Sequence, residues 1–475
     1  MRAHESANDK AQHAAADDAR RALTDLAREV QTLNERGALE RPEAPASERA
    51  RVLYLRGRLQ EAVGVVPDAQ ESREKDAGPP DAANPDKKSV TRSRGAQDTA
   101  EDLLKRAAKL DPALDGAWLT LAQTLWKKND LQGARRCYDA VLAKRPHKKA
   151  LCAASMLCRA LAKCRAEPGS DAQKALVAES LQFAKAAVRL DVDDGHAWYQ
   201  VGTATMSVFF AQGATDKGAL LTALKAYDHA EKGGPTGAGA GDPEKHMREH
   251  PDVHFNRAVI GRYVERYEEA LKGFAEAARL DPALPTKPEV DGILAALAKL
   301  DDGCRGTGAA CKPKRVAAAA RALREEDAAR DDAARVSHEG TSYATRRVAD
   351  LTEGANVGIA VRARPVLDAT ANGSDVSRKS ERRSEAFGAL NLHYVAVDAS
   401  GALFAVSVYG LEDGAVRLSA TLTLLDPDVK DVEVTWGGRR YAFRLVRVDL
   451  PKQILVGGKM PVGRVARPRM ASTHL

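Results

Sequence analysis

The sequence predicts a fold of the multidomain α-then-β class, with an all-α solenoid of helical repeats followed by a small β-barrel. Two observations carry this prediction. A helical pattern of about 34 residues recurs along the first two thirds of the chain. Alternation of apolar and polar residues replaces it after residue 338. The composition agrees, because the 475 residues are 44% hydrophobic but only 5% aromatic, which suits alanine-rich helices.

The repeat is clearest in residues 115–148, DGAWLTLAQTLWKKNDLQGARRCYDAVLAKRPHK. Its first helix places apolar residues at i, i+3, i+4 and i+7, which form one stripe. Small residues let the two helices approach closely, and a proline ends the second helix. The pattern residues are Trp118, Leu121, Ala122, Leu125, Ala134, Tyr138, Val141 and Pro146. Their spacing is that of the tetratricopeptide repeat, a pair of antiparallel helices.

The same spacing returns on both sides of this window, and Gly57 is the expected small packing residue of an earlier first helix. Second-helix positions that match are Ala100, Leu104, Ala107, Pro112, Ala270, Phe274, Ala277 and Pro282. The predicted parts are an N-terminal helix (1–46), a repeat array (47–336) with a disordered insertion (67–98), a Gly-rich loop (232–250) and capping helices (288–336), a barrel (338–462) and a flexible tail (463–475).

The predicted barrel rests on short alternating segments separated by Gly, Asp and Asn. They are NVGIAVRARPVLDA, NLHYVAVDASG, ALFAVSVYG, VRLSATLTLLD, DVEVTWGG and RYAFRLVRVDL. We predict an OB-fold Greek-key barrel, with a polar loop at 372–388. Arg362, Arg364 and Tyr394 resemble a nucleic-acid-binding face, but alternation alone does not say which side of a strand points outward.

The charge is modest, since 73 basic and 66 acidic residues give a formal net charge of +7. Basic patches that face RNA, a ribosome or an acidic protein fit this value. No run of about 18 apolar residues occurs, and the N-terminus lacks the apolar segment of a secretory signal, so no membrane partner is predicted. The six cysteines form no metal-ligand pattern. We expect free thiols in a reducing compartment, which is cytosolic or nuclear.

No catalytic arrangement emerges from the sequence. The segment 233–241 is rich in glycine but lacks the Lys-Ser of a phosphate-binding loop. His338 and His393 stand singly, without a nucleophile beside them. We therefore predict a protein that is not an enzyme, with no catalytic residues, no cofactor and no metal.

Stacked repeats form a concave groove lined by their first helices. Side chains expected to face it are Leu119, Gln123, Trp126, Lys127, Arg159, His196, Tyr199, Thr203, Met206, Asp252, Phe255, Asn256, Val259, Arg262 and Tyr263. Aromatic rings with one Asp and one Arg suit an extended peptide that carries both charge signs. The alternative is that Tyr199 and Phe255 are packing residues and that Asp252 caps a helix after Pro251.

A second candidate surface is the segment CKPKRVAAAARALR at 311–324. Lys312, Lys314 and Arg315 cluster there before an alanine-rich helix. Such a cluster can contact RNA phosphates as point charges without reading sequence. The alternative is a solvated helix face without a partner.

The order of the parts resembles the tetratricopeptide repeat protein five family, described as tubulin-autoregulation factors and stress-responsive transcription cofactors. The stretches that carry the resemblance are KLDPALDGAWLTLAQTLWKKNDLQGA, RLDVDDGHAWYQVGTATMSVFFAQG, HPDVHFNRAVIGRYVERYEEALKGFAEAARLDPALP and GGRRYAFRLVRVDLPKQILVGGK. It covers roughly residues 50 to 460, without the insertion and the Gly-rich loop.

This resemblance implies a ribosome-associated adaptor in the cytoplasm. Family members recognise the nascent N-terminal peptide of tubulins, Met-Arg-Glu, and trigger decay of the translated mRNA through an adaptor and a deadenylase complex. Arg159 in SMLCRAL and Asp252 in HPDVHFNRA match the family's groove charges, and Glu289 is the nearest match to a second carboxylate. Lys312 and Lys314 match the lysines that contact ribosomal RNA and exit-site proteins.

Two other functions remain open from the sequence. The first is a nuclear transcription co-regulator that binds acetyltransferase-type co-activators through the repeats and DNA through the OB fold. The second is a chaperone co-factor that grips acidic C-terminal tails. It is weaker, because such clamps need convergent lysines and asparagines, whereas here Asn256 stands with Asp252 and Thr203.

Overall fold

The computed structural model describes residues 20–33, 35, 37, 39, 41, 43–65, 99–232, 247–330, 332–370, 391–418 and 420–461. Two compact units make up the chain, Met1–Leu157 and Cys158–Leu475. The predicted insertion, the polar loop at 372–388, the tail and most of the Gly-rich loop lie outside the described residues.

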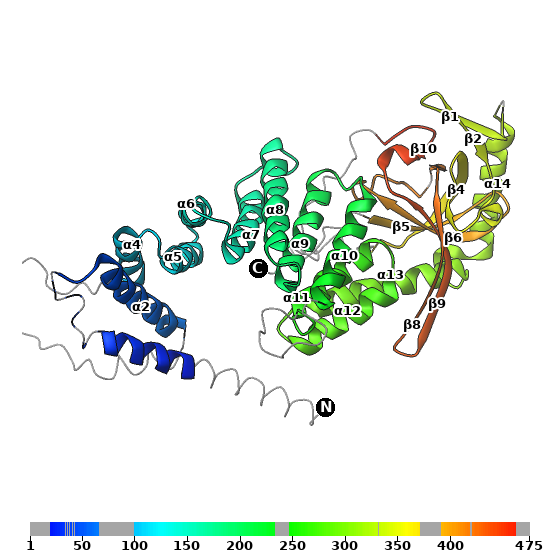
Figure 1. The fold of residues 1–475 in the computed structure, drawn as a ribbon. Coiled ribbons are helices and arrows are strands. Elements are labelled where there is room, and N and C mark those ends of the chain that lie inside the picture. Colours follow the sequence, from blue (N-terminus) through cyan, green and yellow to red (C-terminus); the bar gives the residue numbers. More distant parts are fainter. Residues whose placement is uncertain are drawn as a thin grey trace, which may run out of the picture. The chain divides into compact units, whose positions relative to one another are not determined.

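The first unit is helical (Figure 1). A helix over residues 20–33 buries Val30. The named helices that follow are α2 (Ala46–Val65), α4 (Ala100–Leu110), α5 (Asp115–Lys127), α6 (Leu131–Leu142) and the first part of α7 (Lys148–Cys164). Helix α2 packs against α4, and α5 against α6. A Cβ atom on Gly57 would lie 2.8 Å from Cγ of Leu104, so Gly57 is the small packing residue that the sequence predicted.

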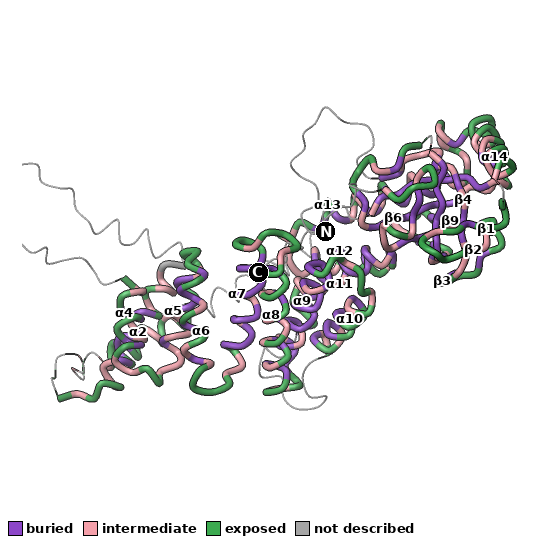
Figure 2. Tube along the Cα trace, turned by 90° about the horizontal axis from the view of Figure 1, so that it is seen from above, coloured by how far each residue is buried: buried purple, intermediate pink, exposed green. Residues whose placement is uncertain are grey.

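The second unit continues the helix pairs and ends in the barrel (Figure 1). Its further helices are α8 (Asp171–Leu190), α9 (Gly195–Ala211), α10 (Lys217–Lys232), α11 (Pro251–Tyr263), α12 (Tyr267–Leu280), α13 (Thr286–Cys304) and α14 (Pro313–Ala328). Figure 2 shows α9 buried along most of its length. Its Gly202 is required there, because a Cβ atom would lie 2.6 Å from the ring of Tyr227 on α10.

Three helix pairs turn through the same kind of helix end. The residue after the C-cap has a left-handed backbone conformation in Asn129 (φ 62°), Gly213 (φ 89°) and Glu265 (φ 60°). The next amide closes the turn, as where Arg266 donates to the Gly261 carbonyl at 2.8 Å. Glycine and asparagine are the usual residues at this position. The glutamate is therefore a departure that calls for a separate cause.

The barrel strands are β1 (Arg335–His338), β2 (Thr341–Thr345), β3 (Gly354–Ala355), β4 (Ile359–Asp368), β5 (Asn391–Val397), β6 (Leu403–Tyr409), β7 (Leu422–Leu425), β8 (Asp428–Trp436), β9 (Arg439–Val448) and β10 (Ile454–Val456). The central order is β4-β5-β6-β9-β8, with β6 and β9 parallel. Strands β7 and β8 are separated only by Asp426 and Pro427. Because β7 pairs with β4 and β8 with β9, this bent segment closes the barrel. The predicted Greek-key barrel is confirmed.

Alternate residues of β5 and β6 face two different cores. Tyr394 and Phe404 lie in the barrel interior. Val395 and Ala405 belong instead to a cluster that includes Leu297 of α13. Helix α13 therefore covers the outer face of β5 and β6.

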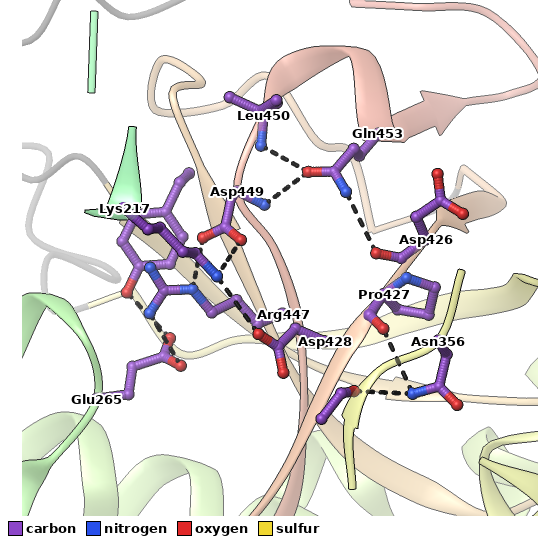
Figure 3. A network of polar contacts seen from close by, with 12 residues as sticks. Lys217, Glu265, Asn356, Asp426, Pro427, Asp428, Arg447, Asp449, Leu450 and Gln453 are labelled. Atoms are coloured by element: carbon purple, nitrogen blue, oxygen red, sulfur yellow. Dashed lines mark hydrogen bonds and ion pairs between the residues drawn. The ribbon is translucent and has the colours of Figure 1, made fainter. Parts of the chain in front are cut away.

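A buried polar network joins the helices to the barrel (Figure 3). Arg447 of β9 pairs with Glu265 at 3.3 Å and with Asp449 at 2.7 Å. Its guanidinium also donates to the Tyr263 carbonyl at 2.9 Å and lies 4.0 Å from the ring centroid of Tyr409. The side chains of Glu265 and Arg447 are only 1% and 6% exposed. Glu265 thus occupies its left-handed turn position because its carboxylate compensates Arg447, and we call this set of residues the junction.

Candidate functional site

Arg159 of α7 is 4% exposed and bridges two helices. One guanidinium nitrogen donates to the Ser180 hydroxyl of α8 at 3.1 Å, and another donates to the amide oxygen of Gln200 on α9 at 2.7 Å. The amide nitrogen of Gln200 in turn lies 3.2 Å from the His196 ring. The arginine is thus held in place from both neighbouring helices.

Tyr199 and Asn256 connect α9 to α11. The Asn256 amide donates to the Tyr199 hydroxyl at 2.9 Å, and both side chains are buried. One turn further along α9, the Thr203 hydroxyl lies 3.2 Å from the hydroxyl of Tyr227. A row of polar side chains therefore runs across α7, α9 and α11.

Asp252 brings the opposite charge to this row. It lies in the first turn of α11, its side chain is 22% exposed, and it is 3.6 Å from the His250 ring. Burial raises the pKa of the Tyr199 hydroxyl, Asp252 raises it further, and Arg159 lowers it. Both charged groups therefore lie within electrostatic reach of the same hydroxyl. We call Arg159, Tyr199, Gln200, Asp252 and Asn256 the polar row.

The other two predicted groove residues have different surroundings. Phe255 is 3% exposed, and its ring centroid lies 5.3 Å from that of Phe274 in an edge-on packing. Glu289 of α13 is 4% exposed and pairs with Arg262 of α11. Arg262 is ten residues beyond Asp252 on the same helix, a rise of about 15 Å. Phe255 thus packs in the core cluster, and Glu289 lies near the other end of α11.

The predicted basic cluster begins helix α14. Lys312 is its N-cap residue, Pro313 opens the helix, and Lys314 and Arg315 follow, all exposed. Within the described residues, none of the three cationic side chains makes an ion pair. Cations at a helix N-terminus oppose the helix dipole, at about 0.3–1 kcal/mol each when exposed. Nothing in the fold therefore requires positive charge at this position.

The barrel arginines are covered rather than open. Arg362 and Arg364 point outward from β4, where they pair with Glu326 of α14, and Arg362 also pairs with Asp327. Tyr394 is fully buried in the barrel interior. These three residues do not form the exposed nucleic-acid-binding face that their sequence pattern resembles.

Within the described ranges, no group of three or more His, Cys, Asp or Glu is arranged to hold a metal ion. The cysteines are free, and four of the six are buried, namely Cys137, Cys152, Cys158 and Cys311. No helix among the described residues combines the length and the apolar character that a membrane span needs.

Comparisons with known proteins bear on both halves of the chain. The model of the tetratricopeptide repeat protein 5 OB fold domain matches residues 342–469, and a tetratricopeptide repeat model matches residues 93–156. The chain is 31% identical to tetratricopeptide repeat protein 5 of Mus musculus over 365 residues, which is 76% of each chain. It belongs to the tetratricopeptide repeat protein 5 family. The Bos taurus and Homo sapiens relatives are 31% and 30% identical, again over 76% of each chain.

Membership of the tetratricopeptide repeat protein 5 family confirms the predicted repeat array and OB fold. It also supports a repeat-based adaptor for protein interactions.

The sequence analysis missed Gln200 of the polar row and also Ser180, the other residue to which Arg159 donates. Polar residues on helices are solvent-exposed by default, so single positions gave no signal. Glu265 did carry a signal, because it occupies the turn position that Asn129 and Gly213 occupy in other pairs.

Proposed function

We propose that this member of the tetratricopeptide repeat protein 5 family is a ribosome-associated adaptor for tubulin autoregulation. It recognises the nascent N-terminal Met-Arg-Glu peptide of tubulins at the polar row and triggers decay of the mRNA being translated. The observation that supports this best is that Tyr199 lies between the two charges, because Arg159 donates to the adjacent Gln200 and Asp252 lies 3.6 Å from the His250 ring, which contacts the Tyr199 ring.

The chemistry of the polar row suits this peptide. The carboxylate of Asp252 is accessible to the arginine of the ligand, and the guanidinium of Arg159 binds its glutamate. Each contact is a charge-assisted hydrogen bond. Arg159 donates to two neutral groups, those of Ser180 and Gln200, and a peptide carboxylate can replace these two acceptors. Tyr199 and Asn256 hold the spacing between the two charges.

We assign further roles to the other residues that the sequence predicted. Phe255 positions α11 by packing on Phe274. Glu289 offers a second carboxylate where Arg262 now lies. Lys312, Lys314 and Arg315 dock the adaptor on the ribosome beside the exit-site proteins, through contacts with RNA phosphates that do not depend on sequence. An mRNA-decay adaptor and a deadenylase complex then act on the bound ribosome in the cytoplasm.

The peptide assignment is tested by titrating Met-Arg-Glu-Ile into the full chain. Arg159→Gln is expected to weaken binding about 10- to 100-fold, because a hydrogen bond between charged groups is worth about 1.5–3 kcal/mol. Arg257→Gln is the matched control, since this arginine of α11 pairs with Asp228 and Glu231 and is not in the polar row. Equal affinity of Arg159→Gln and wild type would overturn the assignment.

The ribosome assignment is tested by co-sedimentation. Lys312→Glu/Lys314→Glu is expected to leave the ribosome pellet at salt concentrations where wild type stays bound. Lys272→Glu/Arg279→Glu on the exposed face of α12 makes the same charge change away from α14. Loss in both variants would mean that only net charge matters, and retention in both would remove the cluster from the proposal.

The nuclear co-regulator function has less support. The strands that usually bind oligonucleotides in OB folds are the second and third, which here are β5 and β6. Their outer face packs against α13. Binding of co-activators through the repeats would still be compatible with this arrangement.

A further inference from the structure

A cavity of about 580 Å³ lies against the outer face of the barrel, beside the C-terminal end of α14. Arg362 and Arg364 of β4 and Thr423 of β7 contribute to its wall, and their strand neighbours Ala363 and Leu424 point into the barrel core. It shares no residue with the polar row or the basic cluster. Its volume is in the range of sites that bind small molecules.

One carboxylate occupies the polar centre of this cavity. Glu326 accepts a hydrogen bond from the Thr421 hydroxyl at 2.6 Å and pairs with both Arg362 and Arg364. Burial works against its ionised form, but the hydrogen bonds from Thr421 and Arg364 lower the pKa of Glu326. The carboxylate oxygens therefore stand where two guanidinium groups and a hydroxyl converge.

The cavity has more positive charge than its own carboxylates neutralise. Arg330 also lines it, so three arginines stand against one lining carboxylate, Glu326, and Arg362 also pairs with the neighbouring Asp327. Arg330 donates to the Arg335 carbonyl at 2.8 Å through one guanidinium nitrogen. Its other terminal nitrogen is buried and has no hydrogen-bond partner among the described residues. A buried donor without an acceptor is costly, and it favours an anion in this cavity.

The lining also includes large apolar side chains. They are Val336 of β1 and Leu455 of β10, and both are nearly fully buried. A bare inorganic anion would contact the arginines alone. A ligand with an anionic end and an apolar body would contact both kinds of side chain.

We propose that this cavity binds a small phosphate monoester, whose phosphate takes the place of the Glu326 carboxylate. Several arginine donors around one position suit phosphate, because guanidinium groups bind its oxygens in a fixed fork geometry. Glu326 is then an internal competitor that holds the arginines until the ligand arrives. This site is independent of the proposed recognition of tubulin peptides.

Phenyl phosphate is a suitable probe, since it joins a phosphate to an apolar ring, and calorimetric titration of the full chain measures its affinity. Glu326→Gln removes the competing charge, so we expect it to bind the probe at least about tenfold more tightly than wild type. Arg364→Gln added to Glu326→Gln should abolish this gain. Arg440→Gln is the control, because this arginine pairs with Glu433 on the β8–β9 hairpin.

Arg330→Gln provides a second test that leaves the contacts of Glu326 intact. We expect it to weaken binding of phenyl phosphate about fivefold or more, because it removes a donor that now lacks an acceptor. Unchanged affinity in both Glu326→Gln and Arg330→Gln would overturn the proposal. The proposal would also fail if titration of Glu326→Gln with sodium chloride of equal ionic strength gave the same signal as phenyl phosphate. It would fail as well if Glu326→Gln bound decathymidylate more tightly than wild type but showed no such gain for phenyl phosphate. The last result would assign the surface to single-stranded nucleic acid.

Discussion

Two arginines of the second unit are almost equally buried, yet their surroundings differ. Arg447 at the junction is enclosed by Glu265, Asp449 and the ring of Tyr409. Arg159 in the polar row donates to a hydroxyl and an amide. A buried charge bound to carboxylates fixes one arrangement of the fold, because breaking it leaves the other charge uncompensated. Neutral acceptors can be exchanged at lower cost for those of a ligand. Burial alone therefore does not tell a structural arginine from one that we propose to bind a ligand.

The largest effect is expected at the junction. Glu265→Gln keeps the shape of the side chain but leaves Arg447 without its most buried carboxylate, and we expect a loss of about 3–5 kcal/mol in the free energy of unfolding. Urea denaturation of the full chain, followed through the transition of the second unit, measures it. A loss below about 1 kcal/mol would mean that the junction does not depend on this charge, and the contrast with the polar row would fail.

Stability should also depend on pH through His393, which is buried on β5 and contacts Asn391, whose amide also donates to the Tyr409 hydroxyl of the junction. Burial lowers the pKa of His393 from 6.5 to about 4. Above pH 6.5 the ring is neutral in both states and the stability of the fold is undiminished. As the pH falls from 6.5 toward 4, the unfolded chain binds a proton at His393 and the folded chain does not, so the free energy of unfolding decreases. At about 1.4 kcal/mol per unit, the loss is about 2 kcal/mol at pH 5 and about 3 kcal/mol at pH 4.

The comparison with His393→Gln isolates this effect from the titration of carboxylates. Wild type should lose about 2 kcal/mol more stability than the variant between pH 7.5 and pH 5. Equal losses in the two proteins would show that the imidazole ring accepts a proton in the folded state near its ordinary pKa.

Arg159→Gln tests the polar-row arginine in the same comparison. Its unfolding free energy should fall by less than that of Glu265→Gln, because two of its acceptors, Ser180 and Gln200, are neutral and can bond to the new amide. Its peptide affinity should fall about 10- to 100-fold at the same time. A variant that loses stability as much as Glu265→Gln would place Arg159 among the structural arginines.

The smallest effect is expected in the first unit. Lys127 and Glu61 form an ion pair at 2.9 Å with the lysine largely exposed. Exposed pairs contribute about 0.2–1 kcal/mol, so Glu61→Gln should lower stability by no more than that. It serves as the reference for Glu265→Gln, and a loss as large as the one at the junction would remove burial as the cause of the difference.

The architecture could be predicted well from the sequence, because helical repeats and strands produce regular local spacings of apolar residues. The helical stripe that includes Trp118 and Leu121, and the alternation in β4 to β9, each have a period that indicates the type of element. Gly57 was identified by its place in the repeat. The candidate site was less accessible. Tyr394 points into the barrel, and Arg362 pairs with α14. Successive residues of a strand point to opposite faces, so an error of one residue in assigning the face places a side chain in the wrong surroundings. The partner of a buried polar side chain, such as Gln200, depends on tertiary contacts that no local pattern encodes.

The proposed reading of the peptide by opposite charges is tested most directly by a double-mutant cycle. Wild type and Asp252→Asn are each titrated with Met-Arg-Glu-Ile and with Met-Gln-Glu-Ile. If Asp252 binds the peptide arginine, the two changes are coupled, and the coupling energy should be at least about 1 kcal/mol. Additive effects, with coupling near zero, would contradict the proposal, because the carboxylate and the arginine would then act independently.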